Sequence, residues 1–438
     1  MKIYLSLSCA MVIAITTGCT TINNDKSNLS KSSQDNSKQV AESAEIAIQQ
    51  ITGELKLKDA LEAAELVSPI LSVAKYKIEA AEAAISQADS FSNPSFKVGG
   101  DNFSGQGDKR GTENMSKTIG ISQKIEFWGK RDKRVSYAKQ KYSIAELEFN
   151  EAKIAIEKKV KLAFLSVYYA QEKEALALKA FDIVKKNYDA VLKRIKSGEI
   201  SSVQANKIKI ELASANIALT RSKRNLKTSR KNLVSLWGSK IANFAKVSDF
   251  STEFFDDLKM EDYKSYLKAH PTVLKLQTII EQEKASLAIN EAKKYPDVTI
   301  SGGLKKDNES DNESYFVGVS IPIPIFNWYS GDVKVSEANI KKADAEKIKT
   351  LLDIEKDLEI CYDEIISAKQ ELDIFENDII PAAEASYQAV AKAFKVGEQS
   401  FLNLLDTQHT LIKAKKTKLD MFLEYQKLII KLNAIVGK

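Results

Sequence analysis

The chain repeats part of its own sequence: YDAVLKRIKSGEIS at 188–201 returns as YQAVAKAFKVGEQS at 387–400. At this constant offset of 199 residues, about eight of the fourteen positions are identical. An internal repeat of this length indicates one architecture used twice. In each copy a glycine, Gly198 or Gly397, interrupts a long helical pattern. Glycine suits a turn between two helices because it tolerates positive φ.

Long helices flank both turns. From about 127 to 197 the pattern is helical with a single early glycine, which at 1.5 Å per residue predicts a rod of roughly 100 Å. A return helix is expected from about 201 to 237. The second copy predicts the same pair, with a first helix over about 332–395 that is broken at Pro381. Helices this long must bury their apolar stripes in a coiled coil or a bundle.

A two-residue alternation precedes each rod. It covers 95–103 and 115–125 in the first copy, and 297–304 and 315–321 in the second. In 115–125 three isoleucines share one face, and threonine, glycine and serine share the other. This is the period of a β-strand, so each copy predicts one hairpin and the chain predicts four strands. An Ala- and Glu-rich helix is expected before the first hairpin, over 54–90.

Four strands are too few to close a cylinder. Open strand edges are not viable in lipid, so several copies of the chain must pool their strands, and cyclic symmetry is the natural solution. The pattern alone does not choose among eight, twelve and sixteen strands. Apolar faces would meet lipid, and polar faces would line a water-filled lumen. The predicted fold class is mostly α with a small contribution to a transmembrane β-barrel; the alternative is two soluble hairpins that cover helix ends.

The N-terminus has the features of a bacterial secretory signal. Lys2 is followed by an apolar run over 3–15 and then by Thr16-Thr17-Gly18-Cys19. The end of this stretch resembles a lipobox, which implies that Cys19 becomes the lipidated N-terminus of the mature chain. Thr20 follows in place of a retention signal, which implies sorting to the outer membrane. Each buried CH₂ of an acyl chain contributes about 0.8 kcal/mol. The alternative is an ordinary signal peptide with an incidental cysteine.

Composition and motifs exclude several function classes. The formal net charge is +6 over 438 residues, and no basic block with interleaved aromatics is present, which argues against nucleic-acid binding. The sequence contains no nucleophile elbow or phosphate-binding loop, so no enzyme is predicted. Its two histidines, His270 and His409, are not spaced as metal ligands, so neither a metal site nor a cofactor is expected.

These patterns predict a division of the chain into five segments. They are a lipoprotein signal peptide at 1–18, a flexible lipid-anchored tether at 19–53, a first repeat at 54–238, a connector at 239–270 and a second repeat at 271–438.

Hairpin, long helix, glycine turn and return helix, all duplicated, resemble the TolC family of outer-membrane efflux proteins. The clearest marks are 188–198 and 387–406, together with IEFWGKR at 125–131 and IPIFN at 323–327. The resemblance covers nearly the whole mature chain. It implies a homotrimer with a twelve-stranded barrel in the outer membrane and a coiled-coil tunnel across the periplasm. It also implies docking onto a periplasmic adaptor protein and an inner-membrane pump.

The Gly-Lys-Arg at 129–131 is similar to the heavy-metal branch of the family, the CzcC-like partners of resistance-nodulation-division pumps. The resemblance also implies a site. Family members carry acidic residues after the second turn that constrict the tunnel mouth, and Asp406 matches one such position. Asn403 and Gln204 stand where other acids can occur, which would weaken the negative ring. The turn residues expected to face the adaptor are Gly198, Glu199, Gly397 and Glu398.

The predicted function is therefore a passive exit duct, with heavy-metal cations as the favoured cargo. Two alternatives remain open at this stage. One is a drug-efflux or type I protein-secretion duct of the same fold. The other is a periplasmic adaptor lipoprotein with a helical hairpin, which would have a soluble β-rich domain.

Overall fold

The structure is a computed structural model that describes residues 53–198, 201–250 and 259–437. Cys19, the predicted signal and tether, and Glu199 lie outside the described residues. The chain divides into two compact units. Unit 1 comprises the described parts of 1–71, 155–256 and 364–431, and unit 2 those of 72–154, 257–363 and 432–438.

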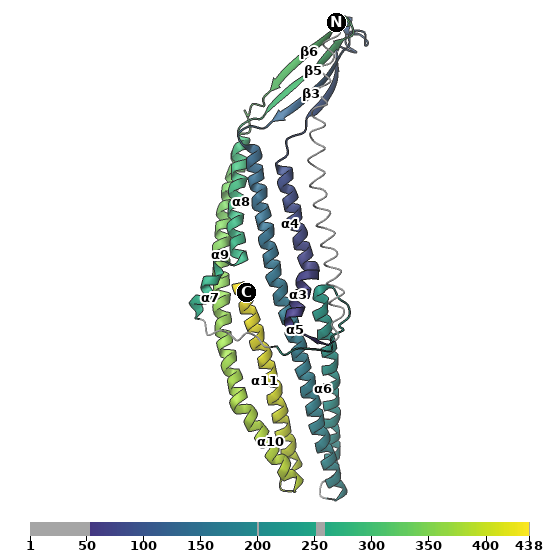
Figure 1. Cartoon of the computed structure of the whole chain (residues 1–438), viewed down its shortest axis with the longest axis vertical. Coiled ribbons are helices and arrows are strands. Elements are labelled where there is room, and N and C mark those ends of the chain that lie inside the picture. The colour runs from purple at the N-terminus through teal and green to yellow at the C-terminus, as the bar shows by residue number, and fades with distance from the viewer. Residues whose placement is uncertain (1–52, 199–200, 251–258, 438) are drawn as a thin grey trace. The chain divides into compact units, whose positions relative to one another are not determined.

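Unit 2 contains an antiparallel sheet in the order β2-β3-β5-β6 (Figure 1). Its strands are β2 (Ser95–Asp101), β3 (Ser116–Ile125), β5 (Val298–Asp307) and β6 (Glu313–Ser320). Both predicted hairpins are present, and they join along β3 and β5. The second hairpin is longer than predicted, because residues expected in its loop continue the ladder, as in the pairing of Lys306 with Glu313. The order leaves β2 and β6 at the edges of the sheet.

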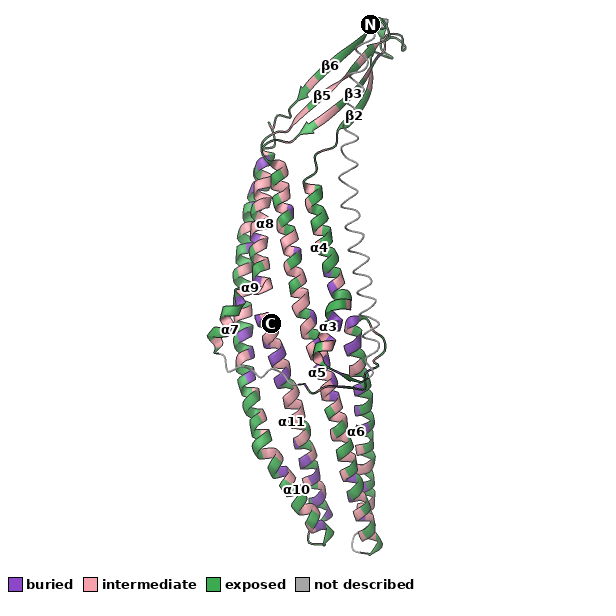
Figure 2. Cartoon of the chain, viewed as in Figure 1, coloured by how far each residue is buried: buried purple, intermediate pink, exposed green. Residues whose placement is uncertain are grey.

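The two faces of this sheet differ as the alternation predicts. Val98, Ile119, Leu304 and Tyr315 pair in one row across the four strands, and all four side chains are exposed (Figure 2). The residues between them along each strand, which point to the opposite face, are mainly glycine, serine, threonine and lysine. The sheet therefore presents a continuous apolar face that no described residue of the chain covers.

The opposite face brings two glycines together at the centre of the sheet. Gly120 of β3 pairs with Gly303 of β5, which in turn pairs with Phe316 of β6. A Cβ at Gly120 would lie 2.9 Å from Cζ of Phe316, and a Cβ at Gly303 would lie 2.7 Å from Cε1 of the same ring. The phenyl ring thus occupies the space that the two missing side chains leave open. An aromatic side chain over glycine is a known way to stabilise a strand that glycine weakens.

The predicted rods are present in both copies (Figure 1). Helix α5 (Lys130–Lys196) has 67 residues, which corresponds to about 100 Å. Its return helix is α6 (Ser202–Val234), which begins after the N-cap Ser201. The second copy runs through α9 (Ser330–Ile374) and α10 (Ile380–Lys395) and returns as α11 (Phe401–Val436). None of the described helices combines the length and apolar character that crossing a membrane requires.

Two helix predictions are wrong in detail. The first rod of the second copy is not broken at Pro381: a π-helical turn, η3 (Phe375–Ile379), leads directly into α10. Proline lacks a backbone N–H, and a π-turn is a common place for a helix to absorb such a defect. The helix expected over 54–90 is instead α3 (Leu57–Val67) and α4 (Pro69–Ala88). Ser68 has an extended ψ of 125° because the following Pro69 disfavours the helical region there.

The connector of unit 1 has structure that the sequence did not predict. Strand β4 (Lys246–Val247) pairs in parallel with β1 (Glu54–Leu55), far away in the chain. The side chain of Gln171 in α5 bonds both backbone groups of Val247: Oε1 accepts from its N–H at 2.8 Å, and Nε2 donates to its carbonyl at 3.3 Å. A two-residue strand has few ladder bonds of its own, so this side chain supplies the missing partners.

In unit 2, α7 (Met260–Leu267) leads to α8 (Pro271–Lys293). His270 is the N-cap of α8, and its Nδ1 accepts from the N–H of Thr272 at 3.2 Å. Burial lowers the pKa of His270. This histidine therefore has a structural role as a neutral helix cap.

Candidate functional site

The two predicted turns have the backbone geometry that their glycines allow. Gly198 has φ +79° and Gly397 has φ +88°. The N–H of Gly397 donates to the carbonyl of Phe394 at 3.2 Å, and the N–H of Glu398 donates to the carbonyl of Ala393 at 3.0 Å. This pair of bonds closes the end of α10 as a Schellman motif, for which a left-handed residue is required.

A buried apolar cluster in unit 1 supports the turns. Its members come from all four helices that meet near this end. The rings of Phe394 and Phe401 lie on either side of the second turn with their centroids 6.5 Å apart. The buried residues of the cluster are Val184, Val191, Ile208, Phe394, Phe401 and Leu404.

Arg194 connects the first turn to the second. Its Nη1 donates to the carbonyl of Phe394 at 3.0 Å, and its guanidinium lies 4.8 Å from the centre of the Phe394 ring. The bond caps one of the last carbonyls of α10, and the cation on the ring adds a second attraction. Sequence reasoning did not single out Arg194. The available signal was its asymmetry: at the offset of 199 its counterpart is Ala393.

The three predicted constriction residues lie near these turns on α6 and α11. Asp406 and Asn403 are exposed, and Gln204 is half-buried. The amide of Asn403 donates to Gln399 at 2.7 Å. Oε1 of Gln204 is buried without a hydrogen-bond partner among the described residues. Whether these residues face their equivalents across a pore depends on other copies of the chain, so the constriction stays a prediction.

Two polar contacts in the same region were not predicted. The buried side chains of Asn187 and Gln408 hydrogen-bond each other, one from α5 and one from α11. On the surface, Nε2 of His409 lies 3.3 Å from a carboxylate oxygen of Glu211. Both contacts join the two helical hairpins, because each pairs a residue of the first copy with one of the second.

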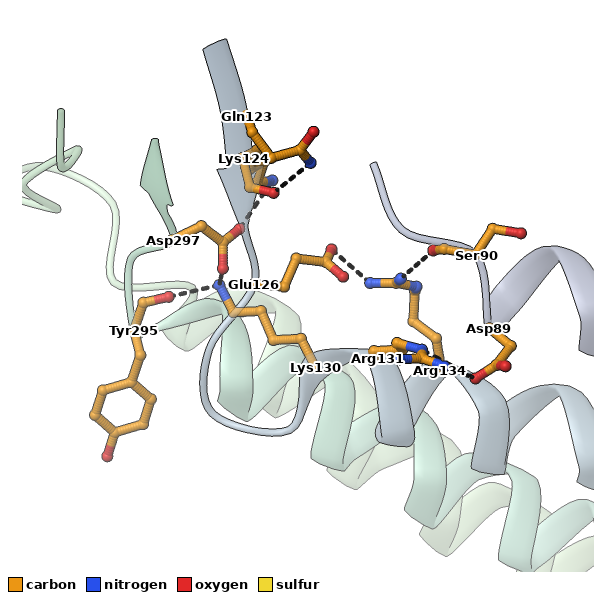
Figure 3. A network of polar contacts seen from close by, with 10 residues as sticks. All are labelled: Asp89, Ser90, Gln123, Lys124, Glu126, Lys130, Arg131, Arg134, Tyr295 and Asp297. Carbon is orange, nitrogen blue, oxygen red and sulfur yellow. Dashed lines mark hydrogen bonds and ion pairs between the residues drawn. The ribbon is translucent and has the colours of Figure 1, made fainter. Parts of the chain in front are cut away.

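The stretch from 125 to 131 has a clear structural role in unit 2. Trp128 and Gly129 both have φ +64°, which turns the chain from β3 into α5. Nζ of Lys130 then donates to the carbonyl of Tyr295 at 2.6 Å and to Asp297 at 2.7 Å, which lie just before β5 (Figure 3). Nζ of Lys124 reaches the other oxygen of Asp297 at 2.8 Å.

Asp297 is the centre of this network. Its side chain is only 12% exposed, and that of Lys130 is 14% exposed. Partial burial acts to raise the pKa of Asp297, but the hydrogen bonds from Lys124 and Lys130 outweigh it and hold the pKa below the usual value of 3.8. Charge-assisted bonds of this kind are short and directional. They therefore hold the end of β3 and the start of β5 against the first turn of α5.

Two arginines of α5 continue the network toward the end of α4. Arg134 bonds Glu126 at 2.6 Å, and Arg131 forms an ion pair with Asp89 at 2.8 Å (Figure 3). Arg131 also lies over the ring of Phe91 at 4.3 Å. The Gly-Lys-Arg of this stretch thus has a local structural function, to join strands to helices, whichever branch of a family carries it.

The duplicated hairpins and rods agree with a known family. The family model described as "Outer membrane efflux protein" matches residues 60–239 and 263–438. The chain belongs to this family. It is an outer membrane efflux channel, and proteins of this family form trimers in tripartite efflux systems. The prediction that the chain is not an enzyme is confirmed, because the family is non-enzymatic.

Among relatives of this efflux protein is the cobalt-zinc-cadmium resistance protein CzcC of Cupriavidus metallidurans. It is 26% identical over 363 residues, which are 83% of this chain and 85% of the relative. The probable outer membrane lipoprotein SilC of Salmonella typhimurium is 19% identical over 369 residues, which are 80% and 79% of the two chains. A solved structure of CusC has the same fold, with a TM-score of 0.75 over 87% of this chain and 92% of that one, at 17% identity.

Family membership also decides among the alternatives. The efflux protein is a channel and not a periplasmic adaptor, so that alternative is set aside. Within the described ranges, no three His, Cys, Asp or Glu side chains are grouped so that they could hold a metal ion.

Proposed function

We propose that this efflux protein is the exit duct of a tripartite system that exports heavy-metal cations. The similarity to the cobalt-zinc-cadmium resistance protein, over more than four fifths of both chains, carries this proposal. The cation is cargo and passes through the duct. A pump in the inner membrane, of the resistance-nodulation-division type, supplies the energy, and a periplasmic adaptor joins the pump to the duct.

Deletion of the gene tests the cargo. The deletion strain should become more sensitive to cobalt, zinc and cadmium, because the pump loses its exit, and the intact gene should restore resistance. Growth inhibition is measured across metals, dyes, detergents and antibiotics. Sensitivity to dyes and antibiotics with unchanged metal resistance would instead assign a drug duct. Failure to release one secreted protein, with all resistances intact, would assign a type I secretion duct.

Within the duct, we place three copies of the chain with their sheets joined edge to edge. The edge strands β2 and β6 are free to pair with neighbouring copies, and the uncovered apolar face would meet lipid. Helix α6 carries a second uncovered surface: Val203, Ile210 and Ile217 are seven residues apart, and each side chain is more than half exposed. Apolar residues at this spacing form the seam of a coiled coil, so α6 is expected to pack against a neighbouring copy.

An Ile210→Glu variant should weaken the trimer. A carboxylate in the middle of this seam would be buried without a partner when the copies associate, which is strongly unfavourable. The matched control is Asn216→Glu, which adds the same charge to an exposed position about 120° round the helix. Heat-modifiable trimers on gels measure the effect. Equal trimer stability in both variants would remove α6 from the interface.

At the turns, we propose that the exposed ends of the hairpins meet the adaptor and that Asp406 narrows the opening. Three copies of this exposed carboxylate around one axis would attract cations, as charged rings do in cation-selective pores. Repulsion among the three charges would favour a wider opening. Gly198, Gly397 and Glu398 lie at the surface of this end, where an adaptor could reach them.

We also propose that Cys19 anchors the mature chain through lipid. The Thr-Gly-Cys at 17–19 and the similarity to a probable outer membrane lipoprotein support this. A Cys19→Ala variant should lose labelling by radioactive palmitate and the corresponding acyl mass. Outer-membrane fractionation is expected to persist, because the apolar sheet face contributes more buried surface than the acyl chains. Unchanged labelling in the variant would place the lipid elsewhere.

A further inference from the structure

An open cleft of about 470 Å³ lies in unit 2 where the strands meet the helices. Lys124 at the end of β3, Lys130 at the start of α5 and Lys293 at the end of α8 all line it. Asp297 and the loop 322–327 after β6 complete the wall. Figure 3 shows Lys124 and Lys130 converging on Asp297 from two different elements.

The cleft has more cations than anions. Asp297 is its one acidic lining residue, and both of its oxygens are already bonded to lysines. Lys293 also lies 3.9 Å from Asp332. Three lysines against these two carboxylates leave one positive charge. The side chains of Lys124 and Lys293 are 49% and 45% exposed, and an ammonium has three protons to donate, so both retain donors for a ligand.

The rim of the same cleft is apolar and uncovered. Ile323 and Ile325 are mostly exposed, and Phe326 is 99% exposed. Trp128 stacks on the lining residue Tyr295 with ring centroids 4.6 Å apart, and Trp328 stands beside the loop. Exposed apolar clusters of this kind mark a contact surface. Tryptophan and tyrosine beside lysine are typical of the boundary between lipid and water.

We propose that this cleft binds the phosphate of an anionic phospholipid headgroup, with the acyl chains lying against the exposed loop after β6. Lys124 and Lys293 would donate to the phosphate, while Lys130 remains committed to Asp297 and Tyr295. A free phosphate ion would use the lysines alone and leave the aromatic rim unexplained, so a lipid accounts for both features. The inference rests on the proposed membrane position of the sheet and adds a specific lipid site to it.

Quenching of tryptophan fluorescence by brominated lipid tests the site in the intact mature protein in detergent. The chain has three tryptophans; Trp128 and Trp328 border the cleft, and buried Trp237 supplies a constant background. Phosphatidylglycerol with brominated acyl chains should quench at lower concentration than brominated diacylglycerol, which has no phosphate. In K124Q/K293Q the concentration needed should rise at least about tenfold, because two charge-assisted bonds are lost.

Two further variants control for charge and fold. K109Q/K117Q removes the same charge from exposed lysines at the loop end of the sheet and should bind phosphatidylglycerol normally. K124R/K293R retains both cations and should bind like the parent chain. Heat-modifiable trimers confirm that each variant has folded.

Each contrary outcome is distinct. Equal quenching by both lipids, or unchanged quenching in K124Q/K293Q, would overturn the phosphate site. Reversal of quenching by millimolar inorganic phosphate without acyl contact would assign a free anion. Loss of the trimer in K124Q/K293Q with normal quenching would make the cleft a contact between copies. The assay contains neither pump nor metal, so its failure leaves the efflux function standing, and a failed metal test leaves the lipid result intact.

Discussion

A Gly303→Ala variant is expected to lose the heat-modifiable trimer and to disappear from the outer-membrane fraction. The new methyl group would lie 2.6 Å from the Cα of Gly120 and would also overlap the carbonyl oxygen of Ile119. Neither obstacle is a flexible side chain, so β3 and β5 must separate. The cost is expected to reach at least about 3 kcal/mol, at the upper end of overpacking. Because these two strands join the hairpins, the whole sheet is affected.

The adjacent Gly302→Ala variant is the matched control. A Cβ there would lie 3.6 Å from the nearest atom, the carbonyl oxygen of Phe316, which is an ordinary contact. It makes the same chemical change in the same strand but points to the other face. Gel mobility before and after heating, together with fractionation, compares the two. Trimers of equal stability in both variants would contradict the close approach of β3 and β5.

A Gly397→Pro variant should abolish efflux while the trimer still forms. Proline holds φ near −65°, whereas this turn requires +88°. It also removes the N–H that donates to Phe394, and it disfavours the present conformation of Val396, with φ −93° and ψ 1°. The turn must therefore be rebuilt at a cost of about 3 kcal/mol. The damage is confined to the end of the hairpins, which the sheet contacts do not include.

Gly397→Asn is the control for this position. Asparagine tolerates the left-handed region better than other residues with a side chain, and it retains the N–H. Metal resistance in the complemented deletion strain is the measurement, with heat-modifiable trimers as the check on assembly. Resistance should be near normal in Gly397→Asn, because the left-handed turn is retained, and absent in Gly397→Pro. Full resistance in the proline variant would separate the turn from transport.

The secondary structure of this protein was largely predictable because its causes are local. A two-residue period predicts a strand and a long uninterrupted helical period predicts a rod, whatever lies beyond them. The duplication made each interpretation stronger, since the turn glycines Gly198 and Gly397 both have positive φ. Gly238 and Gly437, also 199 residues apart, have nearly equal φ values of +81° and +80°.

The errors arose where a local signal was read without its surroundings. Pro381 predicts a break, but the helix absorbs it through the π-turn before it. The Ala- and Glu-rich pattern over 54–90 predicts a single helix, but Ser68 and Pro69 divide it. The candidate site was predictable only in part. The turns follow from glycine, whereas the positions of Asp406, Asn403 and Gln204 around a pore require neighbouring copies.

The amino-acid sequence by itself determined the two hairpins, the two pairs of rods, the turns between them and the membership of an efflux family. Tertiary structure alone decided that β3 meets β5 through paired glycines under Phe316, that Arg194 caps α10, and that Lys124 and Lys130 converge on Asp297. The reason is chain separation. Each of these contacts joins segments more than 150 positions apart, and no local period records which distant segment a side chain will meet.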